Sequence, residues 1–218
     1  MKFDHFMPIY NWLYPISYTK DNENAFSNNL DIFNKIPVSS VTKRAIYIHI
    51  PFCDTICSFC PFVRTTFTNE DLIENYVRAL IQEIKIKSRY DTVTNIPIGA
   101  IFIGGGTPSI LNRNQILEIG KTLKENFNLS QIDEFSCEME VKSITKEKNE
   151  AFKEIGVTHA RFGLQTFNKK YRDLFTLTSS LNQIYNAVQS LNDTFSYVSF
   201  DMLYGMNGQT EKEFIEDL

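Results

Sequence analysis

The chain has 218 residues and a formal net charge of -4, with 43% apolar and 22% charged side chains. This length buries a large core without disulfide or metal staples, and the composition is that of ordinary soluble globular proteins. The acidic balance excludes the basic surface of a nucleic-acid binder. No apolar run approaches the roughly 18 residues of a membrane-spanning helix, so we expect neither a nucleic acid partner nor a membrane span.

Residues 1–44 show no clear periodicity and include the Asn-rich run KDNENAFSNNLD, which predicts an irregular N-terminal extension. Its aromatic opening is interrupted by Asp4, Pro8, Asn11 and Pro15 and is not a signal peptide. It either packs as a latch on the main domain or contacts a substrate or partner. Clustered cysteines in an unexported chain are expected to be reduced and to bind metal, which predicts a cytoplasmic protein.

From Ala45 onward, strand and helix patterns alternate. Short β-branched or apolar runs predict strands at residues 45–50, 98–103, 134–141, 159–165 and 197–205. The segments between them have the apolar spacing of helices, for example Ile73, Val77, Leu80 and Ile84, or Leu181, Ile184, Val188 and Leu191.

Two helix starts carry capping signals. Thr68 and Asp71 predict a capping box, and Thr145 predicts the start of a helix that ends at Gly156. A further helix begins at residue 210.

The alternation of strands and helices predicts an α/β fold with a parallel sheet. Right-handed crossovers would wind residues 45–218 into a partial (β/α) barrel. A complete barrel takes about 250 residues, so we expect this one to be truncated after the fifth β/α unit.

The stretch YIHIPFCDTICSFC holds three of the four cysteines, Cys53, Cys57 and Cys60. A structural zinc site needs four closed ligands, so His49 or Cys137 would have to complete the set. A four-iron cluster held by three thiolates keeps one iron open for a substrate or cofactor. The third interpretation is that these are simply core cysteines.

Other polar and glycine residues stand where predicted strands end. The run GGGTP, residues 104–108, follows the second strand, where glycines let the backbone approach a ligand. Glu138, Gln165 and Asp201 lie on the next three strands. Because ligands of such barrels bind at the carboxyl ends of the strands, we expect these residues around one pocket.

The spacing CxxxCxxC resembles the cluster motif of the radical S-adenosylmethionine (SAM) superfamily. The motifs YIHIPFC, GGGTP, GLQTFN and DMLYGMNGQT are similar to the branch that contains the oxygen-independent coproporphyrinogen III oxidases and a related haem chaperone. The resemblance implies that Cys53, Cys57 and Cys60 ligate a [4Fe-4S] cluster. Its fourth iron would chelate the methionine part of SAM, and one electron would release a 5′-deoxyadenosyl radical.

The resemblance also implies the cofactor contacts. Tyr47 and Phe59 would touch the cofactor, Gly105, Gly106 and Thr107 would lie against its methionine part, and Glu138, Gln165 and Asp201 would surround the rest. The implied partners are a small-molecule substrate such as a tetrapyrrole and an electron donor such as flavodoxin or ferredoxin.

Two positions depart from the branch and argue against a true coproporphyrinogen III oxidase. Phe62 stands where the oxidases have a further cysteine, and Leu177 where the branch has an arginine. Arg172, Lys169 or Lys170 are candidates to replace that arginine.

Three functions follow as hypotheses. The first is a radical SAM enzyme that acts on a porphyrin-like or other aromatic substrate, including by methyl transfer. The second is a haem-binding chaperone without turnover. The third is a catalytically inactive fragment whose open sheet edge needs a partner to cover it.

Overall fold

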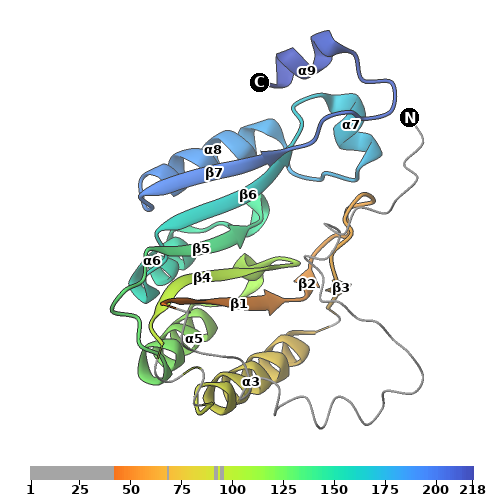
Figure 1. Cartoon of the computed structure of the whole chain (residues 1–218). Coiled ribbons are helices and arrows are strands. Elements are labelled where there is room, and N and C mark those ends of the chain that lie inside the picture. Colours follow the sequence, from red (N-terminus) through yellow and green to blue (C-terminus); the bar gives the residue numbers. More distant parts are fainter. Residues whose placement is uncertain (1–41, 68, 91–92, 94–95) are drawn as a thin grey trace, which may run out of the picture.

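The computed structural model describes residues 42–67, 69–90, 93 and 96–218. Nearly all of the predicted extension, residues 1–44, therefore lies outside the described part. The core is a parallel sheet with strand order β1-β4-β5-β6-β7 (Figure 1). Its strands are β1 (Arg44–Ile50), β4 (Ile98–Gly105), β5 (Glu134–Met139), β6 (His159–Gln165) and β7 (Tyr197–Met202). This arrangement confirms the predicted α/β fold with a partial barrel.

The connections between the strands of this sheet contain helices, as is usual for crossovers between parallel strands. The α-helices are α3 (Glu70–Lys87), α5 (Arg113–Asn126), α6 (Lys146–Ile155), α7 (Lys169–Leu174), α8 (Leu181–Asn192) and α9 (Glu211–Asp217). Short 3-10 helices follow β4 and β5, at η4 (Pro108–Ile110) and η5 (Val141–Ser143). None of the described helices has the length and apolar character needed to cross a membrane.

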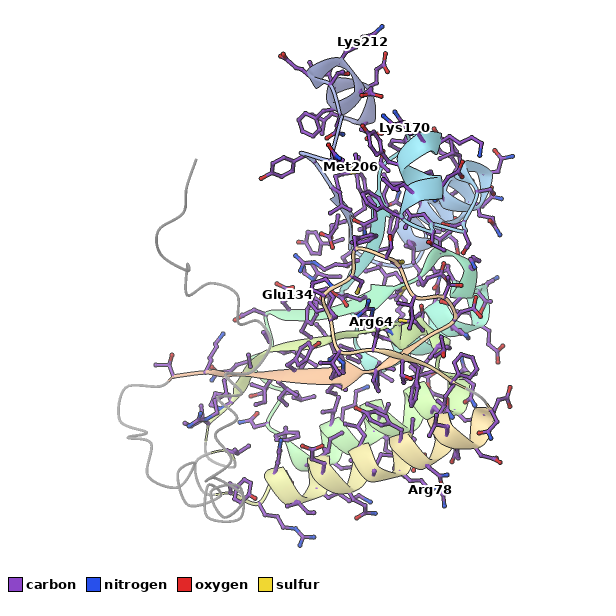
Figure 2. The ribbon with its side chains drawn as sticks, turned by 90° about the vertical axis from the view of Figure 1, so that its right-hand side faces the viewer. Arg64, Arg78, Glu134, Lys170, Met206 and Lys212 are labelled. Carbon is purple, nitrogen blue, oxygen red and sulfur yellow. The ribbon has the colours of Figure 1, made fainter. Side chains whose placement is uncertain are left out.

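Helices α3, α5, α6 and α8 pack on one face of the sheet (Figure 1). The side chains that the strands point to this face are buried, such as Ile50, Ile103 and Leu164. They meet the apolar sides of the helices, including Val77 and Leu123. The alternate strand residues point to the opposite face, over which Figures 1 and 2 show no described helix. The sheet is therefore packed on one face only among its described elements.

Several element ends differ from the sequence predictions. The N-cap of α3 is Asn69, whose side chain accepts from Leu72 N at 3.0 Å, rather than Thr68, which lies outside the described residues. The predicted strand 134–141 ends at Met139, because the Glu140 carboxylate accepts from the amides of Lys142 and Ser143 and starts η5. The strand predicted to reach residue 205 ends at Met202.

Two further details correct the predicted core and sheet. Leu181, predicted on the buried side of α8, is 38% exposed, because Ile184, Ala187 and Leu191 make the contact. A second, two-stranded parallel sheet pairs β2 (Phe52–Cys53) with β3 (Thr65–Thr66) and was not predicted. Thr145 and Gly156 bound α6 as predicted, with Gly156 at a φ of 110°.

Candidate functional site

The three clustered cysteines lie on a closed loop next to the end of β1. The pairing of β2 with β3 joins the two ends of this loop, and Thr65 N donates to the carbonyl of Pro51 at 2.8 Å. A turn in which Cys60 N donates to the carbonyl of Cys57 at 3.2 Å shapes its middle. Cys53 is buried, whereas Cys57 and Cys60 are partly exposed, and all three are free thiols. The segment 53–66 is called the cysteine loop below.

Ten of the eleven predicted site residues line one pocket at the carboxyl ends of the strands. They are Cys53, Cys57, Phe59, Cys60, Gly105, Gly106, Thr107, Glu138, Gln165 and Asp201. The exception is Tyr47, which lies further back along β1 and is not among the lining residues. Residues far apart in the sequence thus meet as the parallel-sheet argument predicted.

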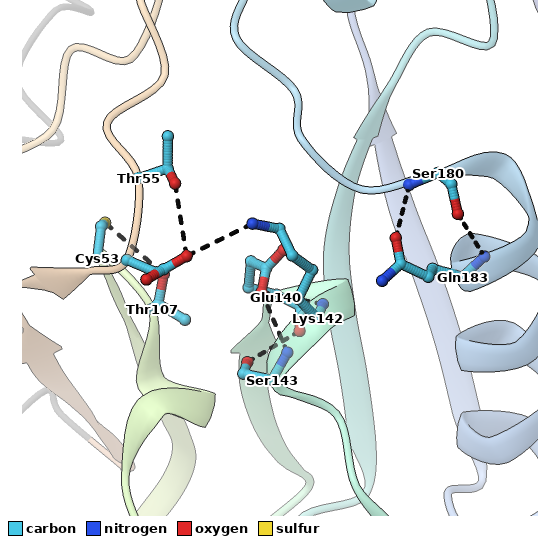
Figure 3. Close-up of polar contacts among 9 residues, drawn as sticks. Cys53, Thr55, Thr107, Glu140, Lys142, Ser143, Ser180 and Gln183 are labelled. Carbon is cyan, nitrogen blue, oxygen red and sulfur yellow. Dashed lines mark hydrogen bonds and ion pairs between the residues drawn. The ribbon is translucent and has the colours of Figure 1, made fainter.

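The run GGGTP, residues 104–108 at the end of β4, is called the glycine loop below. It lies directly against the cysteine loop. A Cβ on Gly106 would be 2.9 Å from Cys53 Sγ and 2.7 Å from the carbonyl oxygen of Phe52. Gly105 has a φ of 115°, and a Cβ there would be 2.8 Å from a ring carbon of His49. Since both contacts are closer than real side chains allow, these positions require glycine. Thr107 Oγ1 then donates to Cys53 Sγ at 3.6 Å (Figure 3).

The surroundings of Cys53 and Cys57 favour the neutral thiol over the thiolate when no metal is bound. Burial raises the pKa of Cys53, and the neighbouring Cys60 raises it further, while the hydrogen bond from Thr107 lowers it. Burial likewise raises the pKa of Cys57, with Cys60 and Cys53 adding to the effect. A bound cationic metal centre favours deprotonation of its thiol ligands. The three thiols lie near enough to influence one another, and cysteine thiolates are the ligands that iron-sulfur clusters take, so the chemistry of the donor set suits such a cluster.

The two residues that could complete a zinc site, His49 and Cys137, both lie outside the pocket. His49 Nε2 donates to the carbonyl of Val63 at 2.7 Å, so its Nδ1 accepts from the Tyr47 hydroxyl at 2.9 Å. Cys137 is fully buried on β5, and burial raises the pKa of its thiol well above its usual value. Neither residue lines the pocket. Within the described ranges, no group of three His, Cys, Asp or Glu side chains has the arrangement that a single metal ion needs.

Two cations line the pocket beside the cysteines. Arg64, labelled in Figure 2, donates to the carbonyl of Phe62 at 2.8 Å, and its Nε is buried without a hydrogen-bond partner among the described residues. Lys142 on η5 reaches Asp54 Oδ2 at 3.4 Å (Figure 3). Lys142 was not predicted from the sequence, where its only signal is its place just past the end of a predicted strand.

The residues suggested to replace the arginine at Leu177 do not reach the pocket. Arg172 is buried and donates to the carbonyls of Leu164, Thr166 and Ser179 at 3.2, 2.8 and 2.7 Å. Lys169 pairs with Asp173, and Lys170 contacts Tyr171, both on α7. None of the three is a lining residue, whereas Leu177 itself is.

The far wall of the pocket contains a carboxylate and strained backbone. Glu138 Oε2 accepts from Gly105 N at 3.1 Å, and burial raises the pKa of this carboxyl group. Gln165 and Thr176, both on the lining, have φ values of 69° and 60°. Such left-handed conformations are rare outside glycine and occur often at ligand sites.

Comparison with known proteins identifies the family of this arrangement. Residues 47–218 match the family model described as the radical SAM superfamily. The anaerobilin synthase of Escherichia coli O157:H7 is 36% identical over 83% of this chain, and the haem chaperone HemW of Lactococcus lactis is 30% identical over 77%. The chain spans 40% and 42% of the lengths of those two proteins.

A solved structure shows the same fold. The coproporphyrinogen III oxidase HemN of Escherichia coli, described as a radical SAM enzyme, aligns with a TM-score of 0.75 and 26% identity. The alignment covers 86% of this chain and 43% of that protein. Together with the sequence matches, it confirms the resemblance drawn from the four motifs.

Proposed function

Because the chain belongs to the radical SAM superfamily, we propose that it is a radical SAM enzyme acting on a porphyrin-like or other aromatic substrate. Proteins of this superfamily generally bind a [4Fe-4S] cluster and SAM. The observation that carries the proposal is the single pocket lined by Cys53, Cys57 and Cys60 together with the glycine loop. We assign residues 45–218 to the radical SAM core.

The three thiolates would hold three irons of the cluster, and the pocket in front of them would hold SAM. When bound, the reduced cluster supplies the electron that cleaves SAM and starts radical chemistry on the substrate. The close contact of Gly106 with Cys53 lets the backbone of the glycine loop lie against the cofactor. Glu138, Gln165 and Asp201 provide oxygen and amide groups suited to ribose hydroxyls and an amino group.

The carboxylate of SAM would pair best with a cationic side chain. The arginine that the coproporphyrinogen oxidase branch has at this site is Leu177 in this chain. Of the two cations on the lining, Arg64 is engaged with the backbone of the cysteine loop. Among the described residues, the Lys142 ammonium group contacts only the exposed Asp54 carboxylate, at 3.4 Å. We therefore assign the carboxylate to Lys142. Phe59 would contact the cofactor from the cysteine loop, where its ring meets that of Phe175.

The names of the similar proteins support a tetrapyrrole as the substrate. The similar proteins include an anaerobilin synthase, an oxygen-independent coproporphyrinogen III oxidase from Helicobacter pylori and haem chaperones. Haem and coproporphyrinogen are tetrapyrroles, which favours a tetrapyrrole substrate. The same matches support the second candidate, a haem chaperone that binds without turnover, because HemW is 30% identical to this chain. An electron donor such as flavodoxin or ferredoxin would serve the enzyme.

The test is to reconstitute the protein anaerobically with iron and sulfide and to supply SAM and a strong reductant. We expect iron and sulfide in the ratio of a four-iron cluster and formation of 5′-deoxyadenosine. Stoichiometric haem binding without 5′-deoxyadenosine would support the chaperone instead. Protein that takes up no iron, or that retains zinc in place of the cluster, would refute both functions.

A further inference from the structure

Ser109 directly follows the glycine loop and is buried, with 1% of its surface exposed. It lies in η4, two residues after Thr107, whose hydroxyl contacts Cys53 Sγ. Serine is mostly exposed in proteins, and a buried serine hydroxyl is expected to have hydrogen-bond partners. The partners of Ser109 are Glu140 and Ser143, which lie 31 and 34 residues further along the chain, at η5.

Ser109, Glu140 and Ser143 form a closed ring of hydrogen bonds, called the serine ring below. The amide of Glu140 donates to Ser109 Oγ at 2.9 Å, and Ser143 Oγ donates to the carbonyl of Glu140 at 2.9 Å. The two hydroxyl oxygens are 2.5 Å apart. Each hydroxyl has one proton, and that of Ser143 is used on the carbonyl, so Ser109 is the donor between the two hydroxyls. Lys148 of α6 holds the ring from outside by donating to the carbonyl of Ser109 at 2.8 Å.

The serine ring fixes the backbone that carries Lys142. The Glu140 carboxylate accepts from the amides of Lys142 and Ser143 at 2.9 and 3.1 Å, while the ring bonds the amide and the carbonyl of Glu140 itself. From this anchored turn the Lys142 side chain extends toward the cysteine loop, where it reaches Asp54 (Figure 3). Lys142 lines the pocket, whereas Ser109 and Ser143 do not. The place of Lys142 relative to the glycine loop therefore depends on hydroxyls behind the pocket wall.

We propose that Ser109 is a positioning residue that makes the pocket selective for the carboxylate of SAM. It acts through Lys142, because the serine ring holds η5 against the end of the glycine loop. A lysine is a compact point charge on a flexible side chain, so the strength of its pairing depends on where the backbone places it. The inference rests on the proposed function, in which Lys142 receives that carboxylate.

The test compares SAM with decarboxylated SAM, which keeps the adenosine, sulfonium and amino groups but has no carboxylate. Equilibrium binding of each to the cluster-loaded protein, without reductant, gives the preference for SAM as the ratio of the two dissociation constants. Ser109→Ala leaves the amide of Glu140 without its acceptor and the Ser143 hydroxyl without its donor. We expect the preference to fall about threefold, because the charge of Lys142 is displaced rather than removed.

Three further variants separate positioning from stability. Ser109→Thr keeps the hydroxyl but adds a methyl group at a buried position, so it should lower the free energy of unfolding and keep the preference. Ser143→Ala removes the less buried hydroxyl of the ring and should lower the preference about twofold, even if Ser109→Ala folds poorly. Ser88→Ala is the matched control, since this serine is 5% exposed and donates to the carbonyl of Lys85 in α3. It should lose stability without any change in preference.

Amide hydrogen exchange of residues 140–143 in the cluster-free protein gives a readout that needs neither iron nor SAM. Exchange should be faster in Ser109→Ala than in the unaltered protein or in Ser88→Ala. Unchanged exchange in Ser109→Ala would overturn the inference.

The binding experiment has two ways to contradict the inference. One is an unchanged preference in both Ser109→Ala and Ser143→Ala, and the other is a loss in Ser109→Thr or Ser88→Ala as large as that in Ser109→Ala. Binding of SAM by those proteins would still leave the proposed function standing. If the unaltered protein binds neither ligand, the proposed function is refuted, and the selectivity assigned to Ser109 is refuted with it.

Discussion

On one side of the pocket, the cysteine loop and the glycine loop contact each other directly. On the opposite side, the lining segments are held by buried residues that do not line the pocket themselves. At Gly106 a single added methyl group would meet Cys53 Sγ and the Phe52 carbonyl. At the ends of β6 and α7, by contrast, buried Arg172 ties three backbone carbonyls together. Buried Asp217 of α9 accepts from Thr166 Oγ1 and Phe167 N at 2.6 and 2.7 Å.

The two sides thus differ in whether the residues that hold them together also line the pocket. The first side depends on residues that themselves line the site, so changes there should remove the metal centre. The second depends on residues that do not line it, so changes there should cost stability first and ligand affinity second. Each of the following substitutions tests one side.

The largest effect is expected at the cysteine loop. Cys57→Ala should abolish formation of a stable four-iron cluster and with it all 5′-deoxyadenosine production, because it leaves only two of the three proposed protein ligands. Iron and sulfide analysis with electron paramagnetic resonance of the reduced protein measures this. Cys137→Ala is the control: it removes a buried thiol on β5 that does not line the pocket, should cost about 1 kcal/mol of stability, and should retain the cluster. Equal iron loss in both variants would contradict the assignment.

Gly106→Ala should disturb the same side through packing alone. The new Cβ would require backbone or Cys53 to move, which costs about 2 kcal/mol and displaces a cluster ligand. We expect a lower midpoint of denaturant unfolding and less than full iron content. Gly205→Ala is the matched control, since its φ of 72° strains alanine by about 1 kcal/mol while no atom lies within 4 Å of the new Cβ. The comparison fails if Gly205→Ala loses iron as Gly106→Ala does.

Arg172→Gln tests the opposite side. Removing the guanidinium leaves buried carbonyls of Leu164, Thr166 and Ser179 without their donor, which should cost about 3 kcal/mol of stability. Since these carbonyls flank Gln165 and the segment 176–179, affinity for SAM should fall while iron content is kept. Lys169→Gln, which breaks only an exposed pair with Asp173, should change the unfolding free energy by less than about 0.5 kcal/mol. Cluster loss in Arg172→Gln would show that the two sides are not separable in this way.

The same contrast explains what could be predicted from the sequence. The five strands, the cysteine spacing and the glycine run are local patterns, and the parallel topology brings their ends together. The pairing of β2 with β3 could not be seen, because two-residue strands have no periodicity. The left-handed Gln165 has no sequence signal, and Arg172 looked like a ligand until its three carbonyl contacts were known. Tyr47 points to the correct face but lies behind the pocket, with its hydroxyl bound to His49.

Lys142→Met tests which cation receives the SAM carboxylate. We expect SAM affinity to fall about fivefold to tenfold, because a partly exposed charged hydrogen bond is lost. Equilibrium binding to the cluster-loaded protein, without reductant, measures it. Lys146→Met removes a neighbouring lysine that pairs with Glu150 on α6 and should bind SAM normally. If the two variants bind alike, another group takes the carboxylate.

The smallest effect concerns Glu138, and its sign depends on pH. Because burial raises the pKa of this carboxyl group in the folded state, ionising it costs stability. The protonated form's advantage is fully present below the unfolded pKa of about 4.3 and is lost as pH rises through the folded pKa. Glu138→Gln keeps an oxygen to accept from Gly105 N and removes the charge. The apo variant should therefore be more stable than the unaltered protein at neutral pH.

Denaturant unfolding at neutral pH and near pH 4 checks this, since the advantage of Glu138→Gln should disappear at the acidic pH. Glu150→Gln, on the exposed side of α6, is the control and should show no such difference. In the same variant we expect weaker SAM binding. A glutamate retained at a cost to stability is what a ligand-binding role requires. If Glu138→Gln instead destabilises the protein at neutral pH, the carboxylate is a structural partner of the glycine loop, and its assignment to the cofactor loses its support.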